Sequence, residues 1–140
     1  MSVKNNSTMQ EYSLPGLVHQ TLASHNDGLN GTEVWMQQVK PGGETPIHYH
    51  ECEEVVVIIK GSGRLSIDGK AIAFASNSTL IIPPAVVHQI VNTGTEDILL
   101  IASFSSTPAK VYTPDGEELP LPWHVTESVT SLSAYPYHGV

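Results

Sequence analysis

Turn-forming residues divide this chain into short segments, and this division limits the folds that it can adopt. The 140 residues include 11 glycines and 10 prolines, several of them grouped at 41–43, 61–63 and 83–84. The segments between these groups are rich in valine and isoleucine and have the length of strands, not of packed helices. Strands that follow one another without helices between them favour an antiparallel sandwich or barrel. We therefore predict an all-β fold.

The individual strands can be placed from these runs. The run at 64–74 alternates around Asp68-Gly69, a dipeptide typical of hairpin turns. The run at 54–59 is apolar at successive positions, which predicts burial on both of its faces. Strands are expected at residues 33–39, 45–50, 54–59, 64–74, 80–82, 88–92 and 98–104.

The chain has the organisation of one domain with a polar extension. Residues 1–13 are polar and have no periodic pattern, so we expect a flexible N-terminal arm. Residues 14–140 have the length of a single domain and contain neither internal repeats nor a linker. A short helix is expected only after Trp123, at the C-terminal end.

Charge and cysteine content exclude several classes of partner. The formal net charge is −8 with only 6 lysines and arginines, so we expect neither a nucleic-acid nor a membrane partner. The N-terminal residues lack the apolar core of a secretory signal. Cys52 is the only cysteine and can form no intrachain disulfide, which suits a reducing compartment. We therefore expect a cytoplasmic protein.

Four side chains have the spacing of a metal site. His48 and His50 stand two residues apart, so in an extended segment their rings lie on one face. Glu54 follows across a short connection, and His88 comes from a later strand. Imidazole and carboxylate groups bind divalent first-row metals, and Zn, Mn, Fe, Ni and Co all accept them. We predict one divalent transition metal at His48, His50, Glu54 and His88.

The same residues also allow plainer interpretations. A degenerate barrel could have kept the histidines without a metal. The remaining histidines have no partner at the spacing of metal ligands, and we interpret them as core or surface residues: His19, His25, His124 and His138. Cys52 is interpreted as a free structural thiol. Tyr49 and Glu53 are expected to face away from the metal.

Two stretches of the sequence resemble the cupin family. Residues 42–61 read G-x5-H-x-H-x3-E-x6-G, which is similar to the first cupin motif without a gap. Residues 83–92 resemble the second motif, P-x-G-x2-H-x3-N, with Ala85 in the place of its glycine. The resemblance implies a cupin jelly-roll β-barrel that holds a metal through the four residues named above. It also implies a homodimer, with the N-terminal arm as the bridging or exchanged piece.

Within the cupins, the chain is most similar to the auxin-binding proteins of plants. The likeness is carried by Trp35, Pro41-Gly42 and residues 45–48, 52–55, 60–61, 77–79, 82–83, 88–89 and 108–110. The resemblance implies a zinc ion that takes the carboxylate of an aromatic acid in an apolar and aromatic pocket. Residues at pocket positions are Leu17, Trp35, Thr45, Pro46 and Trp123. Gln37 alternates with Trp35 and is a further candidate for this lining.

The sequence leaves the choice between a binding protein and an enzyme open. A metal with three or four protein ligands keeps positions for water, substrate or dioxygen. A metal-dependent enzyme of the dioxygenase, isomerase or decarboxylase class is therefore the alternative, and a structural cupin with an incidental metal is a third. No unassigned inward Asp, Glu or Lys stands out as an acid or base, which favours binding of a small carboxylate.

Overall fold

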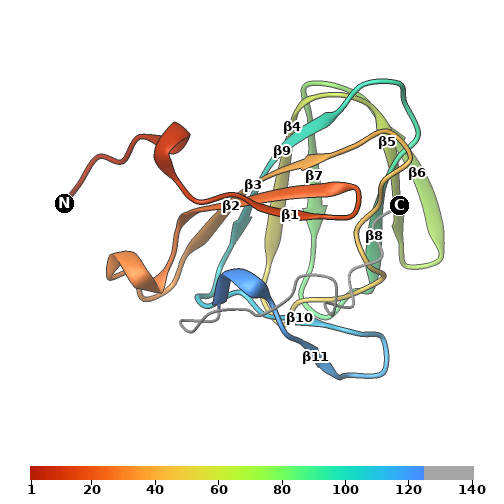
Figure 1. Cartoon of the computed structure of the whole chain (residues 1–140). Helices are drawn as coiled ribbons and strands as arrows, with labels where there is room; N and C mark the ends of the chain where they lie inside the picture. The colour runs from red at the N-terminus through yellow and green to blue at the C-terminus, as the bar shows by residue number, and fades with distance from the viewer. Residues whose placement is uncertain (125–140) are drawn as a thin grey trace.

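Two antiparallel sheets form most of the structure, a computed structural model that describes residues 1–124 (Figure 1). The larger sheet has the strand order β1-β2-β3-β9-β4-β7, and the smaller has the order β6-β5-β8. In the larger sheet the strands are β1 Tyr12–Leu14, β2 Leu17–Ala23, β3 Glu33–Val39, β9 Ile98–Phe104, β4 Glu54–Lys60 and β7 Ser78–Ile82. In the smaller sheet they are β6 Lys70–Phe74, β5 Gly63–Ile67 and β8 His88–Asn92. The predicted all-β fold is confirmed.

Short elements complete the described chain. β10 Val111–Tyr112 and β11 Glu118–Leu119 form a small hairpin. Three single turns of 3-10 helix are η1 Asn6–Thr8, η2 His25–Asp27 and η3 Pro122–His124. Within residues 1–124, none of the helices has the length and hydropathy that crossing a bilayer requires. The helix expected after Trp123 lies outside the described residues, apart from η3.

One core fills the space between the sheets. Val56 and Phe104 of the larger sheet belong to the same buried cluster as Leu65 and Ile90 of the smaller sheet. Alternation in β3 buries Glu33, Trp35, Gln37 and Val39 and leaves the residues between them half-buried. The strand predicted at 33–39 is thus confirmed, and its buried face points polar as well as apolar side chains inward.

The segment that carries His48 and His50 is not the regular strand predicted at 45–50. It is joined to its neighbours by isolated bridges, His48 to His88 and Tyr49 to Tyr112. Pro46 has no N–H group to donate, which prevents a continuous ladder here. The segment nevertheless spans the gap between β8 and β10, with His48 bridged to the smaller sheet and Tyr49 to β10.

The prediction that the 54–59 run is buried on both faces was wrong. Glu54, Val56 and Ile58 point inward, whereas Val55, Val57 and Ile59 are 39%, 39% and 47% exposed. Neighbouring β7 continues this exposed row with Ile81, which is 73% exposed. Successive apolar residues can fill a buried strand or give a strand an apolar outer face, and the run alone does not separate these cases. The larger sheet therefore carries exposed valine and isoleucine on its outer side.

The connection between β7 and β8 contains an alanine in the left-handed region. Ala85 has φ 63°, and its N–H donates a hydrogen bond of 2.7 Å to the carbonyl oxygen of His50. This is the position at which the sequence has alanine where the cupin motif has glycine. The turn is therefore formed with alanine, in a conformation that disfavours a Cβ atom.

The N-terminal arm contacts β2 and the turn that follows it. Lys4 Nζ lies 2.8 Å from Asp27 Oδ1 and 3.1 Å from the carbonyl oxygen of Leu22. Gln20 Nε2 donates to the carbonyl oxygens of Asn6 and Met9. The predicted boundary at residue 13 falls inside β1, which pairs with β2. The mobility of residues 1–13 in solution and the single-domain organisation of 14–140 stay predictions.

Candidate metal centre and aromatic cluster

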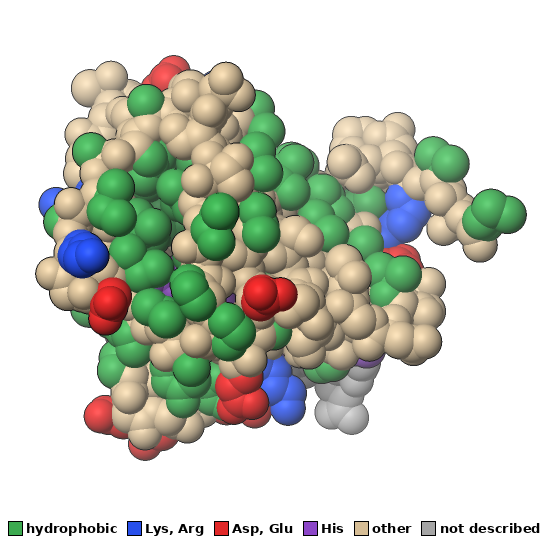
Figure 2. Space-filling view, turned by 180° about the vertical axis from the view of Figure 1, so that it is seen from behind, with side chains coloured by type: hydrophobic (Ala, Val, Ile, Leu, Met, Phe, Trp, Pro, Cys, Tyr) green, Lys and Arg blue, Asp and Glu red, His purple; other side chains and the backbone are tan. Residues whose placement is uncertain are grey.

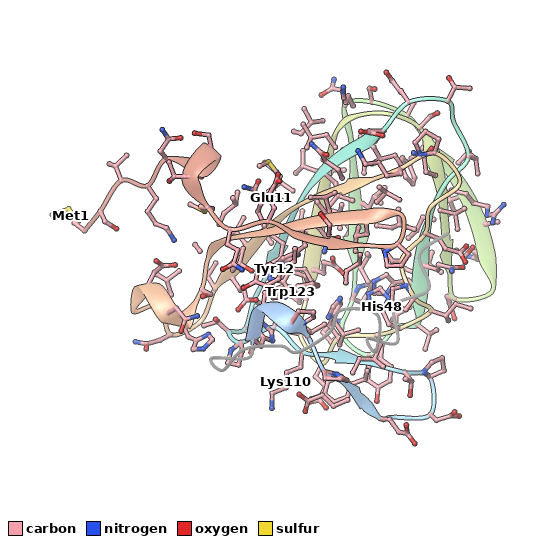
Figure 3. All side chains as sticks on the ribbon, in the orientation of Figure 1. Met1, Glu11, Tyr12, His48, Lys110 and Trp123 are labelled. Carbon is pink, nitrogen blue, oxygen red and sulfur yellow. The ribbon has the colours of Figure 1, made fainter. Side chains whose placement is uncertain are left out.

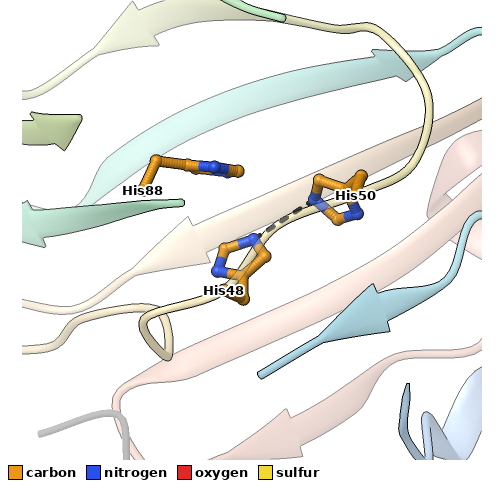
Figure 4. A group of neighbouring side chains, drawn as sticks. All are labelled: His48, His50 and His88. Atoms are coloured by element: carbon orange, nitrogen blue, oxygen red, sulfur yellow. Dashed lines mark hydrogen bonds between the residues drawn. The ribbon is translucent and has the colours of Figure 1, made fainter. Parts of the chain in front are cut away.

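Three histidines converge between the sheets (Figure 4). Their ligand atoms lie within 4.8 Å of one another, and all three residues are buried. The backbone bridge between His48 and His88 brings the two rings together, with N–O distances of 3.0 and 2.8 Å. His48 Nε2 and His50 Nε2 are 3.2 Å apart. The structure thus brings together residues from two distant segments, as the spacing predicted.

Main-chain carbonyl oxygens orient all three imidazoles. Nδ1 of His48 lies 2.6 Å from the oxygen of Pro46, Nδ1 of His50 lies 2.8 Å from that of Lys110, and Nδ1 of His88 lies 2.9 Å from that of Val86. A carbonyl oxygen only accepts, so each Nδ1 carries the proton and each neutral ring presents a lone pair at Nε2. Tautomers fixed in this way are typical of histidines that bind metals.

Glu54 completes the group from the first position of β4. Its Oε1 lies 3.3 Å from His50 Nε2 and 3.2 Å from His88 Nε2. This oxygen is buried and has no hydrogen-bond partner among the described residues. A buried carboxylate oxygen without a donor is costly. A cation between Glu54 and the three Nε2 atoms would remove that cost, so the four residues fit a divalent metal.

Electrostatics at this site tie the protonation of the histidines to the charge of Glu54. Burial, followed by the charges of His88 and His50, holds the pKa of His48 well below its usual value. Burial also lowers the pKa of His50, but the Glu54 carboxylate and the Lys110 carbonyl outweigh it and the net shift is upward. Burial raises the pKa of Glu54, but His50 and His88 more than reverse this and leave it far below the usual range. Glu54 is therefore an anion, and its charge can be balanced either by a protonated imidazole or by a metal ion.

All but one of the predicted pocket residues are buried, and two of the set lie next to the histidines. Trp35 lies next to His50, with ring centroids 6.3 Å apart, and Pro46 supplies the carbonyl oxygen that His48 donates to. Thr45 instead bonds the backbone N–H of Ile90 through its hydroxyl. Leu17 is fully buried on β2, and Gln37 donates to His19. Pro46 is the half-buried member of the set.

Trp123 and Trp35 belong to one aromatic cluster with His19. Trp123 stacks on His19 with ring centroids 3.5 Å apart and planes 13° apart. Trp35 meets both rings edge-on, at 5.0 Å from His19 and 5.3 Å from Trp123. In Figure 3, His48 and Trp123 lie toward the same end of the molecule, the end that carries β10. We call His19, Trp35 and Trp123 the aromatic cluster.

His19 was interpreted from the sequence as a core residue, and its place in the aromatic cluster was missed. Gln37 Nε2 donates to Nδ1 of His19 at 3.0 Å, and Nε2 of His19 lies 2.7 Å from Thr21 Oγ1. Both ring nitrogens of His19 therefore have hydrogen-bond partners, as expected for a buried histidine in the core. Burial, and then the charge of His124, holds the pKa of His19 well below its usual value. The alternation of Leu17 and His19 on one strand face was the signal that could have placed it beside the pocket.

Glu33 is the second residue that the sequence did not single out. Its carboxylate is fully buried at the start of β3 and accepts hydrogen bonds from Trp35 Nε1 at 2.5 Å and His124 Nε2 at 2.9 Å. Thr107 Oγ1 and the backbone N–H of Ala109 donate to its other oxygen, at 2.8 and 3.2 Å. Its position two residues before Trp35 predicts a shared face, but its partners come from segments far along the chain.

The residues between the metal ligands point elsewhere. The ring of Tyr49 stacks on that of Tyr112, with centroids 5.3 Å apart, away from the three histidines. Glu53 is exposed, and its backbone N–H donates a hydrogen bond to Ser105 Oγ. Cys52 is a half-buried free thiol, and burial raises its pKa. A raised pKa disfavours the thiolate, the form that binds metals and reacts.

Comparison with known proteins agrees with this geometry. A family model described as "Auxin binding protein" matches residues 2–137. Auxin-binding protein 1 of Arabidopsis thaliana is 43% identical over 122 residues, which cover 79% of this chain and 62% of that protein. Auxin-binding protein T85 of Nicotiana tabacum is 37% identical over 141 residues, covering 92% of this chain and 72% of that protein. This chain thus spans less than two thirds of the length of the Arabidopsis protein.

A solved structure supports the fold. An RmlC-like cupin from Shewanella frigidimarina aligns with a TM-score of 0.67 at 20% identity, over 75% of this chain and 90% of that one. An identity this low shows the fold alone, and the fold is the cupin jelly roll that the two sequence motifs implied. From the family match over residues 2–137 and the identity to the plant proteins, the chain belongs to the auxin-binding protein family of cupins.

Proposed function

We propose that this protein holds one divalent transition metal at His48, His50, Glu54 and His88 and binds a small aromatic carboxylate on it. The observation that carries the proposal is a group of three buried histidines, two of which lie next to a buried carboxylate oxygen that has no hydrogen-bond partner among residues 1–124. A bound divalent metal would supply a Lewis-acidic centre with positions left for the oxygens of a carboxylate. The ligand types suit several metals, and zinc is favoured by the family likeness.

The aromatic cluster supports an aromatic ligand. Trp35 stands between the metal-binding histidines and Trp123, and its ring lies 6.3 Å from His50 and 5.3 Å from Trp123. Rings in such positions offer edges and faces to an aromatic body whose carboxylate is held at the metal. The names of the related plant proteins point to auxin as their ligand. For this chain we propose the wider class of small aromatic carboxylates.

The polar residues near the site support binding over catalysis. Glu54 faces His50 and His88, and both oxygens of Glu33 already accept hydrogen bonds. Among residues 1–124, neither carboxylate is therefore free to take a proton from a substrate in this arrangement. A metal-dependent enzyme would need the metal alone to activate its substrate.

Elemental analysis of protein purified without an affinity tag is the first test. We expect about one metal per chain in the wild type and none in a His88→Ala variant. Calorimetric titration of the zinc-loaded protein with indole-3-acetate and benzoate should then show saturable binding, lost in His88→Ala. Metal without carboxylate binding would favour a catalyst for another substrate, and wild-type protein without metal after zinc dialysis would contradict the proposal.

We further propose that the protein is a homodimer and is cytoplasmic. The exposed row formed by Val55, Val57, Ile59 and Ile81 carries no charge, although the chain has a net charge of −8. Figure 2 shows hydrophobic side chains gathered on the face turned away from the viewer of Figure 1. An uncharged β-branched surface suits a second copy of itself better than a charged partner.

The proposed localisation rests on a different observation. The single free cysteine supports a reducing compartment, and imaging of a fluorescent fusion protein would test it.

A further inference from the structure

One buried carboxylate connects three segments that are distant in the sequence. Glu33 opens β3, Thr107 and Ala109 follow β9, and His124 ends η3, yet all of them meet at the Glu33 oxygens. Oε2 accepts from the two ring N–H groups, of Trp35 and His124, and Oε1 accepts from Thr107 and Ala109. One oxygen therefore bonds the aromatic rings, and the other bonds the loop after β9.

Glu33 carries its charge in the interior. Burial raises the pKa of Glu33, but hydrogen bonds from His124, Trp35 and Thr107 together outweigh burial and leave it below its usual value. A buried anion is stable only where donors replace its hydration, and loss of one donor leaves an uncompensated charge. His124 is a partly exposed group with its ring against this anion, at 2.9 Å, and His25 lies nearby with its ring centroid 6.4 Å from that of His124.

These contacts involve both tryptophans, one directly and one through its neighbour in η3. Glu33 bonds the indole of Trp35 directly. It holds η3 through His124, and Trp123 is the neighbouring residue within that single turn. Hydrogen bonds within η3 are few: the backbone N–H of His124 donates to the oxygen of Leu121 at 3.0 Å. A turn this short needs tertiary contacts to keep its place, and the bond to Glu33 is one of them.

We propose that Glu33 is a positioning residue for the aromatic wall of the ligand pocket, acting on Trp35 directly and on Trp123 through His124. This inference rests on the proposed function, because it assumes that the aromatic cluster faces the ligand. It separates two parts of the binding energy: contact of the carboxylate with the metal depends on the histidines and Glu54, whereas contact with the aromatic body depends on Glu33 and His124.

Two ligands and two variants test this separation. The protein is loaded with cobalt, whose visible spectrum reports carboxylate binding at the metal, and is titrated with acetate and with indole-3-acetate. His124→Ala removes the bond that holds η3, whereas Thr107→Ser keeps the hydroxyl that donates to the same carboxylate. We expect His124→Ala to weaken indole-3-acetate about tenfold and leave acetate unchanged, and Thr107→Ser to change neither. Equal weakening of both ligands, or of neither, would overturn the proposal.

Fluorescence tests the positioning role without any ligand. The chain has two tryptophans, so a Trp35→Phe background leaves Trp123 as the sole indole. In that background, His124→Ala should shift the emission to longer wavelength and raise quenching by acrylamide, whereas Thr107→Ser should do neither. His124→Gln keeps a side-chain N–H donor and should restore part of the wild-type signal. If His124→Ala fails to fold, the comparison of His124→Gln with the wild type still tests the proposal.

The two readouts distinguish the possible failures. Unaltered Trp123 emission in both His124 variants would show that Glu33 does not hold this residue, and the inference would fall even if ligands bind. If the wild type binds neither acetate nor indole-3-acetate but Trp123 emission responds as expected, Glu33 positions the cluster and the proposed function is at fault.

Discussion

The Glu54 oxygen that faces two histidines is the most informative single atom in the structure. With every Nδ1 proton directed at a carbonyl oxygen, the Nε2 atoms near Glu54 Oε1 have no hydrogen to donate in the neutral state. The arrangement is then unfavourable by itself and favourable around a cation. At this scale, the chemistry of the donor set indicates a metal more strongly than the sequence spacing does.

Replacing that carboxylate by its amide tests the assignment. Glu54→Gln keeps the shape of the side chain but removes the charge, so we expect metal affinity to fall by more than the roughly 10–100-fold that loss of an outer-shell partner costs. Competition with a chromophoric chelator measures this. Glu53→Gln, on the exposed neighbouring residue, is the matched control and should leave the affinity unchanged. Equal affinities in Glu54→Gln and wild type would remove Glu54 from the site.

Glu33 should make stability depend on acidity. Its pKa is below the usual range in the folded protein, so the unfolded chain takes up this proton at a higher pH than the folded protein does. Its contribution is therefore complete at neutral pH and is lost as the pH falls through the folded-state pKa. We expect Glu33→Gln to cost about 1–3 kcal/mol at pH 7 and to flatten the acid side of the stability profile measured by urea unfolding. The same dependence of stability on pH in Glu33→Gln and in the wild type would contradict this prediction.

At the scale of elements, strand-like runs between turns predicted β3, β8 and β9 correctly, and each of these strands has one buried face. Local pattern was insufficient at 45–50, where Pro46 and long-range bridges decide the conformation. It was also insufficient for the outer face of β4, since valine and isoleucine suit both a core and an interface. The partners of Glu33 could not be predicted, because they meet only after the sheets have formed.

The turn between β7 and β8 offers a prediction about stability. Ala85 has φ 63°, a conformation that costs an L-residue roughly 1–2 kcal/mol relative to glycine, part of which glycine loses again in chain entropy. We expect Ala85→Gly to stabilise the protein by about 0.5–1 kcal/mol in urea unfolding. Ala73→Gly, on strand β6, should instead destabilise it, because that residue lies in extended backbone. Destabilisation by Ala85→Gly would mean that the turn is not strained.

For the molecule as a whole, the candidate metal site connects parts that the sheets leave separate. Its ligands come from the bridging segment before β4, from β4 itself and from β8 of the other sheet. A metal that binds only the folded state adds about 4 kcal/mol when its free concentration is 1,000 times its Kd. We expect a chelator to lower the melting temperature of the wild type and to have no effect on His88→Ala. An equal response of the two proteins to chelator would count against metal at this site.

The outer side of the larger sheet is the surface on which the proposed homodimer can be tested. Ile81→Lys places a charge on the most exposed residue of the uncharged row on β4 and β7, and we expect it to convert the proposed dimer to monomer in sedimentation experiments. Ile72→Lys, on β6 of the other sheet and 49% exposed, is the control and should leave the dimer intact. Dissociation by Ile72→Lys alone would place the interface on the smaller sheet, and a monomeric wild type would exclude the dimer.

The bonds that fix the three imidazoles end on main-chain oxygens, of Pro46, Lys110 and Val86. Every amino acid supplies such an oxygen, so substitutions at these three positions preserve the hydrogen bonds as long as the backbone keeps its path. Side chains around the candidate metal site can therefore be exchanged without loss of the bonds that orient the rings. The shape of the surrounding pocket and the orientation of the three imidazoles are in this way set by different parts of the chain, the first by side chains and the second by the backbone.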